Sequence, residues 1–506
     1  MAHPDAAEWE VACDAEKRAF EHMGVYQVVP RPKGRRVVGS RWVFRVKRGP
    51  DGAILKYKAR VVAQGFTQIE GVDYDETFAP VAKLTSLRVI LALTAEYNLE
   101  VHQMDVKSAY LNGELKEEIY MEPPPGFDTP DGMVFRLVKA VYGTKQGGRV
   151  WYEDIRKTLE EMGYHHTEAD HAVFVRAADD FPSILALYVD DITMASKDIR
   201  GIERDKEKLK ARYQMTDLGE ISWILGVRVT RDRKAGWVAL SQEKYIREVL
   251  ERFGKSETRP ISTPSLANEH LTKLTSPEIE VKPYQSAVGA LMYPMLGTRP
   301  DMAYAMAALG RHAANPGAEH QRALDRAFRY LHGTSDWELV FQRGRPGGGV
   351  LKGYVDADWA SDVNDRKSTS GFVFVLAAGA ICWSSKKQAS VALSSTEAEY
   401  IAAAHATKEV VWLRRLLNEL GQATKAPTHL HIDNQSAIAI ARNPEFHDRT
   451  KHIDVRYHFL RQRVDDEEIL LTYLPTDDQI ADVLTKGLAR AKHKRFSEEM
   501  GLRRAD

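Results

Sequence analysis

The sequence predicts a multidomain α+β protein. Its 506 residues, 43% hydrophobic and 28% charged, have the composition of an ordinary globular protein. At about 100–200 residues per domain, the length predicts about three to five domains or lobes, each able to bury a core. Strand-like and helix-like segments alternate along the chain, and glycine- or proline-rich stretches separate them.

The charges and cysteines exclude several classes of protein. The 71 basic and 71 acidic residues balance, so no overall basic field indicates a nucleic-acid partner. Two cysteines, Cys13 and Cys382, exclude a disulfide framework and disfavour a thiolate zinc site. The longest apolar stretch, 371–383, is too short to span a membrane and predicts a buried strand. Because the N-terminus also lacks an apolar signal core, we expect a soluble intracellular protein in a reducing compartment.

The N-terminal part predicts a helix followed by a basic hairpin. Residues 9–23 are helix-like, residues 26–32 are extended, and residues 35–66 form two strands around a turn at 49–52. Basic residues lie along both strands: Arg41, Arg45, Lys47, Lys56, Lys58 and Arg60. They form either a solvated strand face or a cradle for phosphates.

The middle of the chain predicts further helices and strands. We expect helices over 86–97 and 202–213 and one that ends within 159–163, a buried strand over 101–106, a loop over 121–132, a strand over 183–196 that two aspartates interrupt, and a hairpin over 221–242.

The last part predicts a linker, a helical region and a second αβ region. Residues 257–283 are polar and rich in Pro, Ser and Thr, residues 283–332 are helical, and the glycine-rich stretch 343–350 is the clearest boundary. Strand-rich sequence then leads to a long helix over 395–420. The period changes from strand to helix at Asp433.

Two adjacent aspartates in an apolar setting are the most specific chemical feature. Asp190 and Asp191 interrupt apolar strand sequence, and burying unpaired carboxylates costs several kcal/mol, so they require a cation. Asp105 supplies a third carboxylate from the strand over 101–106. Such a set suits two divalent ions about 3.5–4 Å apart that promote phosphoryl transfer. A tight turn between strands is the alternative explanation for the aspartate pair.

Several motifs in sequence order resemble one known family. They are RWVFRVKRGPDG, KARVVAQGFTQIEGVDYDETFAPV, HQMDVKSAYLNGEL, YGTKQ, YVDD, TRPD, SSTEAEY and ADVLTK. From Trp9 to about Leu488 the chain resembles the reverse transcriptase–ribonuclease H region of copia-type retrotransposons. The resemblance implies a right-hand polymerase with fingers, palm and thumb, a helical connection, and a ribonuclease H-like α/β domain. The expected parts are fingers and palm (1–241), thumb and connection (242–345), a ribonuclease H-like domain (346–490) and a charged tail (491–506).

The resemblance also implies roles in a polymerase site. Asp105 and Asp190 would ligate two metal ions, and Asp191 would assist. Tyr110 would exclude a ribose 2′-hydroxyl, unless it is a core tyrosine. Lys56, Lys58 and Arg60 would bind the incoming triphosphate, and Gln146 would support the templating base pair.

Two features of this region leave alternatives open. Thr144 and Gly147 depart from the family's usual LYGLKQ-A-P-R and raise a question about packing there. The hairpin over 221–241, with Trp223 and Trp237, resembles a primer-gripping hairpin, but two buried tryptophans would equally be ordinary core.

A second set of carboxylates lies in the C-terminal region. Asp356 and Asp358 share one strand face, whereas Glu397 and Glu399 lie on nearly opposite faces of one helix, so only one of these glutamates can serve a site. Taken singly, each acid could be a solvated surface residue. The resemblance to ribonuclease H selects four acids: Asp356, Glu399, Asp433 and Asp482. These four suit two Mg²⁺ ions that activate water. Three histidines are expected nearby, either as surface residues or with one that assists product release: His447, His452 and His458.

The implied function is RNA- and DNA-directed DNA synthesis with a fused ribonuclease H. Mg²⁺ or Mn²⁺, two ions per site, would be the cofactor, and the partners would be an RNA template, a DNA primer, dNTPs and the RNA/DNA hybrid, with no membrane. Capsid-like and integrase proteins of the same element would act with it, in the cytoplasm, within virus-like particles and with access to the nucleus. The chain is expected to be a fragment, a processed product or a truncated gene product. The alternative is an inactive or repurposed remnant that only binds nucleic acid.

Overall fold

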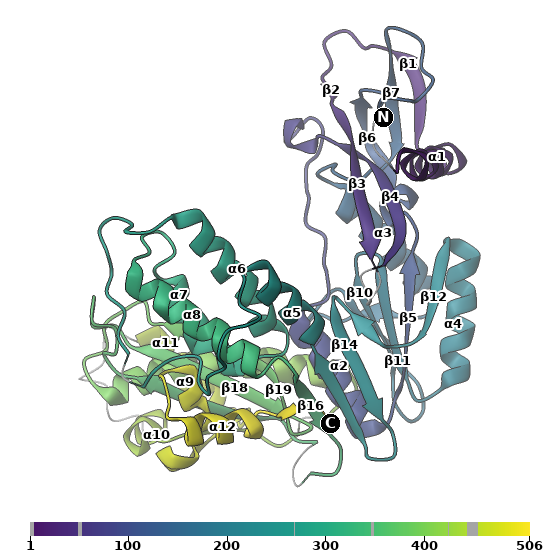
Figure 1. The fold of residues 1–506 in the computed structure, drawn as a ribbon. Coiled ribbons are helices and arrows are strands. Elements are labelled where there is room, and N and C mark those ends of the chain that lie inside the picture. Colours follow the sequence, from purple (N-terminus) through teal and green to yellow (C-terminus); the bar gives the residue numbers. More distant parts are fainter. Residues whose placement is uncertain are drawn as a thin grey trace. The chain divides into compact units, whose positions relative to one another are not determined.

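The computed structural model describes residues 5–48, 53–267, 269–345, 349–423, 425–442 and 454–505. Two compact units can be distinguished: unit 1 contains 1–82 and 101–220, and unit 2 contains 83–100 and 221–506. Helices and strands alternate in both units (Figure 1), which confirms the predicted α+β class. No helix among the described residues is both long enough and apolar enough to cross a bilayer.

The described residues of unit 1 form two larger sheets, a hairpin, three α-helices and two short 3₁₀ helices. The sheets have the orders β1-β7-β6-β2 and β12-β5-β11-β10-β9-β8, and β3 pairs with β4 alone. The strands are β1 Tyr26–Pro30, β2 Val37–Val38, β3 Ser40–Arg48, β4 Ile54–Ala63, β5 Glu100–Val106, β6 Glu114–Met121, β7 Met133–Lys139, β8 His165–His166, β9 Val173–Arg176, β10 Ser183–Tyr188, β11 Asp191–Ser196 and β12 Met215–Glu220. The helices are α1 Ala6–His22, α3 Gly147–Glu161, α4 Ile199–Arg212 and the short η1 Gly65–Thr67 and η2 Ala109–Asn112.

Hydrophobic periodicity explains how the elements of unit 1 pack. Trp151 and Ile155 of α3 and Leu209 of α4 form one core with the buried residues of β10 and β11, so both helices cover the six-stranded sheet. Phe20 of α1 joins the buried residues of β4, β6 and β7 in a second core. The predicted helix over 9–23, the basic hairpin and the buried strand at 101–106 are confirmed.

Unit 2 contains two five-stranded sheets and most of the helices. The sheet orders are β13-β14-β15-β16-β22 and β19-β18-β17-β20-β21. The strands are β13 Trp223–Ile224, β14 Val227–Asp232, β15 Trp237–Ser241, β16 Trp337–Gln342, β17 Lys352–Asp358, β18 Thr369–Leu376, β19 Gly379–Lys387, β20 Thr428–Ile432, β21 Ile469–Tyr473 and β22 Leu502–Arg504. The helices are α2 Leu84–Tyr97, α5 Glu243–Arg252, α6 Val281–Gly297, α7 Ala303–Gly310, α8 Ala318–Gly333, α9 Ser395–Glu419, α10 Gln435–Arg442, α11 Asp454–Asp465, α12 Arg490–Glu499 and the short η3 Pro300–Met302, η6 Thr476–Asp478 and η7 Ile480–Leu484.

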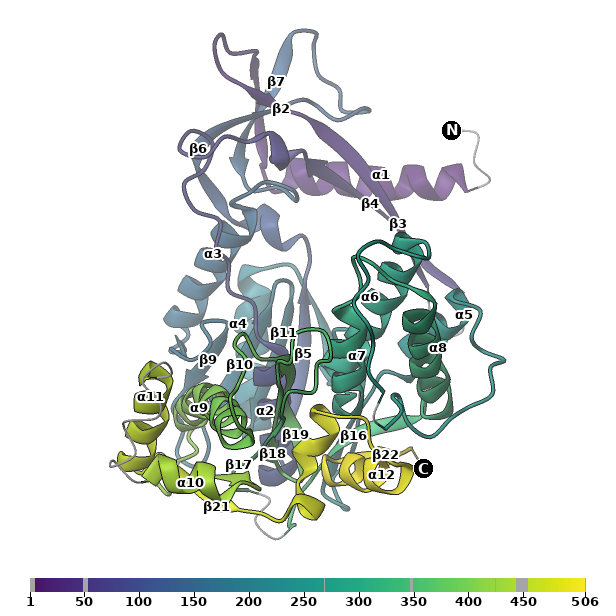
Figure 2. The same cartoon turned by 90° about the vertical axis from the view of Figure 1, so that its left-hand side faces the viewer.

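The second sheet of unit 2 has the ribonuclease H-like arrangement expected from the sequence. β17, β18 and β19 are antiparallel, whereas β20 and β21 run parallel to β17. Figure 2 shows α9, α10 and α11 grouped beside this sheet, and α9 packs on β17 and β18. The residues expected to form a tail, 491–506, contain α12 and β22. The predicted functional boundaries at 241, 345 and 490 stay a prediction.

Two local predictions need correction. The apolar stretch 371–383 is not one strand but most of β18 and the start of β19, joined at Ala377 and Ala378, whose φ angles of 49° and 59° are positive. Apolar periodicity did not reveal this turn because alanine is not a typical turn residue. Trp223 is 39% exposed rather than buried, because it lies on the short edge strand β13.

Two carboxylate clusters as candidate active sites

The first carboxylate cluster consists of Asp105, Asp190 and Asp191. Asp105 lies near the end of β5, Asp190 lies in the turn between β10 and β11, and Asp191 begins β11. β5 and β11 are neighbours in the sheet, and the backbone N–H of Val106 donates to the carbonyl of Asp190 over 2.8 Å. The strand pairing therefore brings all three aspartates together at the ends of two central strands, β5 and β11.

The turn that carries Asp190 is held in an uncommon conformation. Val189 has a φ of 58°, a region that β-branched residues rarely adopt. The indole N–H of Trp151, on α3, donates to the Val189 carbonyl over 2.7 Å. The aspartate pair does form a turn between strands, as the alternative explanation required. The same turn nevertheless places both carboxylates beside Asp105.

Burial and mutual repulsion affect the carboxyl groups of this cluster. Burial and the charges of Asp190 and Asp105 raise the pKa of Asp191 to about 6. Burial and the Asp190 charge also raise the pKa of Asp105, against the opposing effect of Lys47, Lys58 and Arg60. The cluster is therefore a site of concentrated negative potential that a cation would relieve.

The predicted triphosphate-binding side chains share one face of β4. Lys56, Lys58 and Arg60 occupy alternate positions along the strand; Lys56 is exposed, and Lys58 and Arg60 are half-buried. Burial and the neighbouring charges of Arg60 and Lys47 lower the pKa of Lys58, whereas Asp105 and Asp190 oppose this change. Lys47, opposite Lys56 in the β3–β4 pairing, belongs to the same basic group, although the sequence analysis did not assign it to the site.

Tyr110 lies close to the first cluster. Burial, and to a smaller extent the Asp190 charge, raise its pKa. Its ring centroid is 4.7 Å from that of Tyr142, and the Arg60 guanidinium lies 4.1 Å from the Tyr142 ring centroid. Tyr110 is therefore half-buried against an aromatic neighbour beside the carboxylates.

Gln146 is buried, and both its side-chain amide nitrogen and its oxygen form hydrogen bonds. Its amide nitrogen donates to the Asp73 carbonyl over 2.8 Å and to Glu117 Oε2 over 3.3 Å, and its oxygen accepts from Gln68 Nε2 over 3.1 Å. Gly143 in the same segment packs directly on β4: it has a φ of 90°, and a Cβ there would lie 2.2 Å from the Ala63 carbonyl oxygen. The 142–147 segment thus packs against the end of β4 and leads into α3.

Two of the residues that depart from the family pattern, Thr144 and Gly147, fit each other. The Thr144 hydroxyl donates to the Val141 carbonyl over 2.7 Å, and a Cβ on Gly147 would lie 2.7 Å from that same Thr144 oxygen. Glycine at 147 therefore leaves room for the threonine hydroxyl. At these two positions the departure is a matched pair rather than a packing defect.

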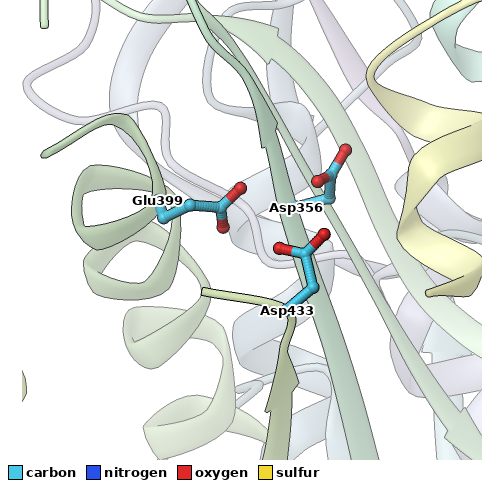
Figure 3. A group of neighbouring side chains, drawn as sticks. All are labelled: Asp356, Glu399 and Asp433. Atoms are coloured by element: carbon cyan, nitrogen blue, oxygen red, sulfur yellow. The ribbon is translucent and has the colours of Figure 1, made fainter. Parts of the chain in front are cut away.

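The second carboxylate cluster consists of Asp356, Glu399 and Asp433. Figure 3 shows the three side chains converging from β17, from α9 and from the end of β20. One oxygen of each lies within 4.8 Å of the others, and among the described residues no other group of three acids, histidines or cysteines is this close. The carboxylate oxygens of Asp105, Asp190 and Asp191 lie farther apart than this 4.8 Å limit.

Hydrogen bonds hold the second cluster in place. The Ala357 N–H donates to Glu399 Oε1 over 2.9 Å, and the Thr476 hydroxyl donates to Asp433 Oδ2 over 2.8 Å. The Thr485 hydroxyl donates to Asp356. Glu397 instead faces the helix start, where its Oε2 accepts from the Leu393 N–H over 2.8 Å. Only Glu399 of the two glutamates reaches the cluster, as helical geometry predicted.

The second cluster has the properties of a divalent-cation site. Burial raises the pKa of Asp356 to about 7, although Lys486 opposes the change. Burial and the charges of Asp356 and Asp433 raise the pKa of Glu399 well above its usual range. Glu399 Oε2 is buried and has no hydrogen-bond partner among the described residues. A buried, unpartnered carboxylate oxygen between two other carboxylates fits a hard cation such as Mg²⁺.

Asp482 is fully buried beside this cluster and is paired with two lysines. Its Oδ1 lies 2.8 Å from Lys486 Nζ, and its Oδ2 lies 2.9 Å from Lys492 Nζ. Neither lysine was predicted from the sequence, although the spacing of four residues between Asp482 and Lys486 is one at which ion pairs form on helical turns.

Of the three histidines, the structure describes only His458. His447 and His452 lie outside the described residues, and His458 is exposed on α11.

The first cluster lies in a segment that matches a known protein family. The reverse transcriptase (RNA-dependent DNA polymerase) family matches residues 23–267, a segment that contains the whole first cluster. The second cluster lies beyond that match, in the ribonuclease H-like sheet.

Known relatives extend the similarity over nearly the whole chain. The retrovirus-related Pol polyprotein from transposon TNT 1-94 of Nicotiana tabacum is 44% identical over 99% of this chain and 38% of its own length. The putative transposon Ty5-1 protein YCL074W of Saccharomyces cerevisiae is 34% identical over 61% of this chain and all of that protein. A solved foamy viral protease-reverse transcriptase in complex with double-stranded DNA covers 92% of this chain and 70% of its own, with 13% identity and a TM-score of 0.49.

The chain belongs to the copia-type retrotransposon Pol family and corresponds to its reverse transcriptase–ribonuclease H region. It spans less than two fifths of the tobacco polyprotein.

Proposed function

We propose that the chain is an RNA- and DNA-directed DNA polymerase with a fused ribonuclease H that degrades the RNA of an RNA/DNA hybrid. The observation that carries the proposal is the presence of two separate carboxylate clusters on one chain, each partly buried and each with raised carboxyl pKa values. Perturbed carboxyl groups of this kind gather at functional sites.

The first cluster is the proposed polymerase site. Asp105 and Asp190 hold the metal ions, and Asp191 assists them. A divalent cation held there would stabilise the charge that develops when a primer hydroxyl attacks a dNTP phosphate. Lys56, Lys58 and Arg60 bind the triphosphate, Tyr110 excludes a 2′-hydroxyl, and Gln146 supports the template-binding segment.

The second cluster is the proposed nuclease site. Asp356, Glu399 and Asp433 hold one ion, and Asp482 completes the set. Mg²⁺ or Mn²⁺ bound there would activate water toward an RNA phosphodiester. The hybrid is recognised through its backbone and 2′-hydroxyls rather than its sequence.

The partners and location follow from the family. We propose an RNA template, a DNA primer and dNTPs as substrates, and capsid-like and integrase proteins of the same element as partners. The protein would act in the cytoplasm, within virus-like particles, with access to the nucleus.

One assay tests both activities. A DNA primer on a labelled RNA template is incubated with the protein, dNTPs and Mg²⁺. We expect wild type to extend the primer and cut the RNA, Asp190→Asn to lose extension alone, and Asp356→Asn to lose cutting alone. Asp179→Asn, at an exposed aspartate of unit 1, is the matched control and should retain both. If wild type binds the hybrid but does neither, the protein is a nucleic-acid-binding remnant.

A further inference from the structure

Lys486 lies between two carboxylates of the proposed nuclease site. Its Nζ is 2.8 Å from Asp482 Oδ1 and 3.8 Å from Asp356 Oδ2. Its side chain is 34% exposed, whereas those of Asp356 and Asp482 are 3% and 0% exposed. The ammonium group therefore bridges two buried acids from the solvent side.

This bridge divides the four acids into two unequal halves. Glu399 Oε2 has no hydrogen-bond partner among the described residues. The two Asp482 oxygens also lack a hydrogen bond there, but each lies within ion-pair distance of a lysine. The Asp482 side already has two cations, because Lys492 Nζ lies 2.9 Å from Asp482 Oδ2. A metal ion is thus needed to neutralise the first half, whereas lysines already neutralise the second.

A divalent ion that bridges Asp356 and Asp482 would need the position of the ammonium. Two cations at van der Waals distance repel each other strongly in a partly buried site. The lysine side chain is long and partly exposed, so it is able to move aside, whereas the two buried aspartates are not.

We propose that Lys486 controls entry of the second metal ion: the free protein binds one divalent ion at Asp356, Glu399 and Asp433, and a second enters between Asp356 and Asp482 only by displacing the ammonium. This inference rests on the proposed nuclease site. Lys486 is a positioning residue in this scheme, because it acts through the acids and the second ion.

Mn²⁺ binding to the full-length protein tests the proposal without measuring activity. Isothermal titration calorimetry is done without nucleic acid in an Asp105→Asn/Asp190→Asn background, which removes the first cluster as a competing site. We expect one stronger and one weaker Mn²⁺ site. Lys486→Met should strengthen the weaker site at least about tenfold, equivalent to about 1.4 kcal/mol, and change the stronger site less than about threefold. Lys486→Gln should behave in the same way and replaces Lys486→Met if that variant does not fold.

Lys492→Met is the matched control. It removes the same charge from the same Asp482, but Lys492 forms no ion pair with Asp356 among those of the described residues. We expect it to change the weaker site less than about threefold. The inference is overturned if wild type binds two ions equally, if Lys486→Met leaves the weaker site unchanged or absent, or if both lysine variants have the same effect.

A further variant separates this inference from the proposed function. Asp433→Asn should abolish the stronger Mn²⁺ site. If it does not, the proposed nuclease site itself is wrong; if it does and Lys486→Met has no effect, only the role of Lys486 is wrong.

Discussion

Thr144 and Gly147 show how one side chain determines what its neighbour must be. A Cβ on Gly147 would approach the buried Thr144 hydroxyl oxygen to 2.7 Å. We expect Gly147→Ala to lower the free energy of unfolding by about 1–3 kcal/mol, because a buried, hydrogen-bonded group must shift. Urea denaturation of the purified protein measures the change.

A double-mutant cycle tests the cause of that loss. In a Thr144→Ala background the crowding oxygen is absent, so Gly147→Ala should cost at least about 1 kcal/mol less than in wild type. Equal costs in the two backgrounds would show that helix entry at α3, rather than the Thr144 contact, requires glycine.

The ionisation of Asp356 predicts how stability depends on pH. Burial raises its pKa from 3.8 to about 7, so the folded protein keeps a proton there that the unfolded chain has lost. The associated stability is present below pH 4 and is lost as pH rises through about 7. In EDTA, Asp356→Asn should therefore raise the thermal midpoint more at pH 8 than at pH 5.5, by at least about 2 °C.

Metal binding should reverse this trend, because the ionised carboxylate is the proposed metal ligand. With Mg²⁺ added, wild type should gain more thermal stability at pH 8 than at pH 5.5, and Asp356→Asn should gain little at either pH. A wild-type gain that does not depend on pH would contradict this account.

At single residues, helical phase predicted that only one of the two glutamates of α9 could serve a site, and the resemblance selected Glu399. Helical phase separated Glu399 from Glu397, and the structure brings Glu399 to Asp356 and Asp433. Lys486 and Lys492 were missed because lysines are usually solvated, and their pairing with Asp482 depends on how η7 and α12 pack. The roles of the catalytic and substrate-binding residues stay predictions.

Among the elements, α9 carries two glutamates with different surroundings. Glu397 bonds to the backbone before the helix, and its own N–H donates to Ser394 Oγ over 3.1 Å, which stabilises the helix start. Glu399, two residues later, faces the second cluster. The same substitution at the two positions should therefore have different effects.

Glu399→Gln should retain the fold and lower ribonuclease H activity at least about 100-fold, because a metal ligand loses its charge. Glu397→Gln should lower the free energy of unfolding by less than about 1 kcal/mol and change activity less than about threefold. Hybrid cleavage and urea denaturation of both variants provide the comparison. Loss of cleavage in Glu397→Gln alone would reverse the assignment.

Helices and strands were predicted well where their hydrophobic periodicity determines them. They were predicted poorly where a turn lacks typical turn residues such as glycine or asparagine. The β3–β4 hairpin and α9 follow their hydrophobic periodicity closely. The turn at Ala377 and Ala378 was missed, because its positive φ angles are imposed by the pairing of β18 with β19 rather than by glycine or asparagine. Sheet order likewise depends on contacts between distant segments.

For the whole molecule, the main feature is that unit 2 includes α2, which precedes most of unit 1 in sequence. Residues Ser86–Ala95 of α2 are all buried, and the helix packs on β15, β16 and β19. Arg88 donates to the carbonyls of Ile381, Leu296 and Gly297 over 2.7, 2.7 and 3.0 Å. The sequence did not predict this, because only long-range contacts reveal which unit a helix joins.

Because unit 2 consists of two separate stretches of the chain, truncating the chain at one position cannot yield a complete unit 2. A fragment of residues 221–506 should have a lower thermal midpoint than unit 2 in the full chain, because removing α2 leaves buried carbonyls unpaired and exposes apolar surface. A peptide of residues 83–100 should raise the fragment's midpoint, measured by circular dichroism. The same peptide with Arg88→Ala should raise it less. Equal effects of the two peptides would show that the guanidinium bonds are unimportant.

The position of α2 also has a consequence during synthesis. Arg88 and Ile381 are 293 positions apart, so at about 5–20 residues per second the helix waits about 15–60 s on the ribosome before β19 is made. During that interval an apolar helix that carries an arginine has left the exit tunnel, and its binding surface does not yet exist. Until the C-terminal half of the chain emerges, the nascent protein presents a segment that chaperones recognise.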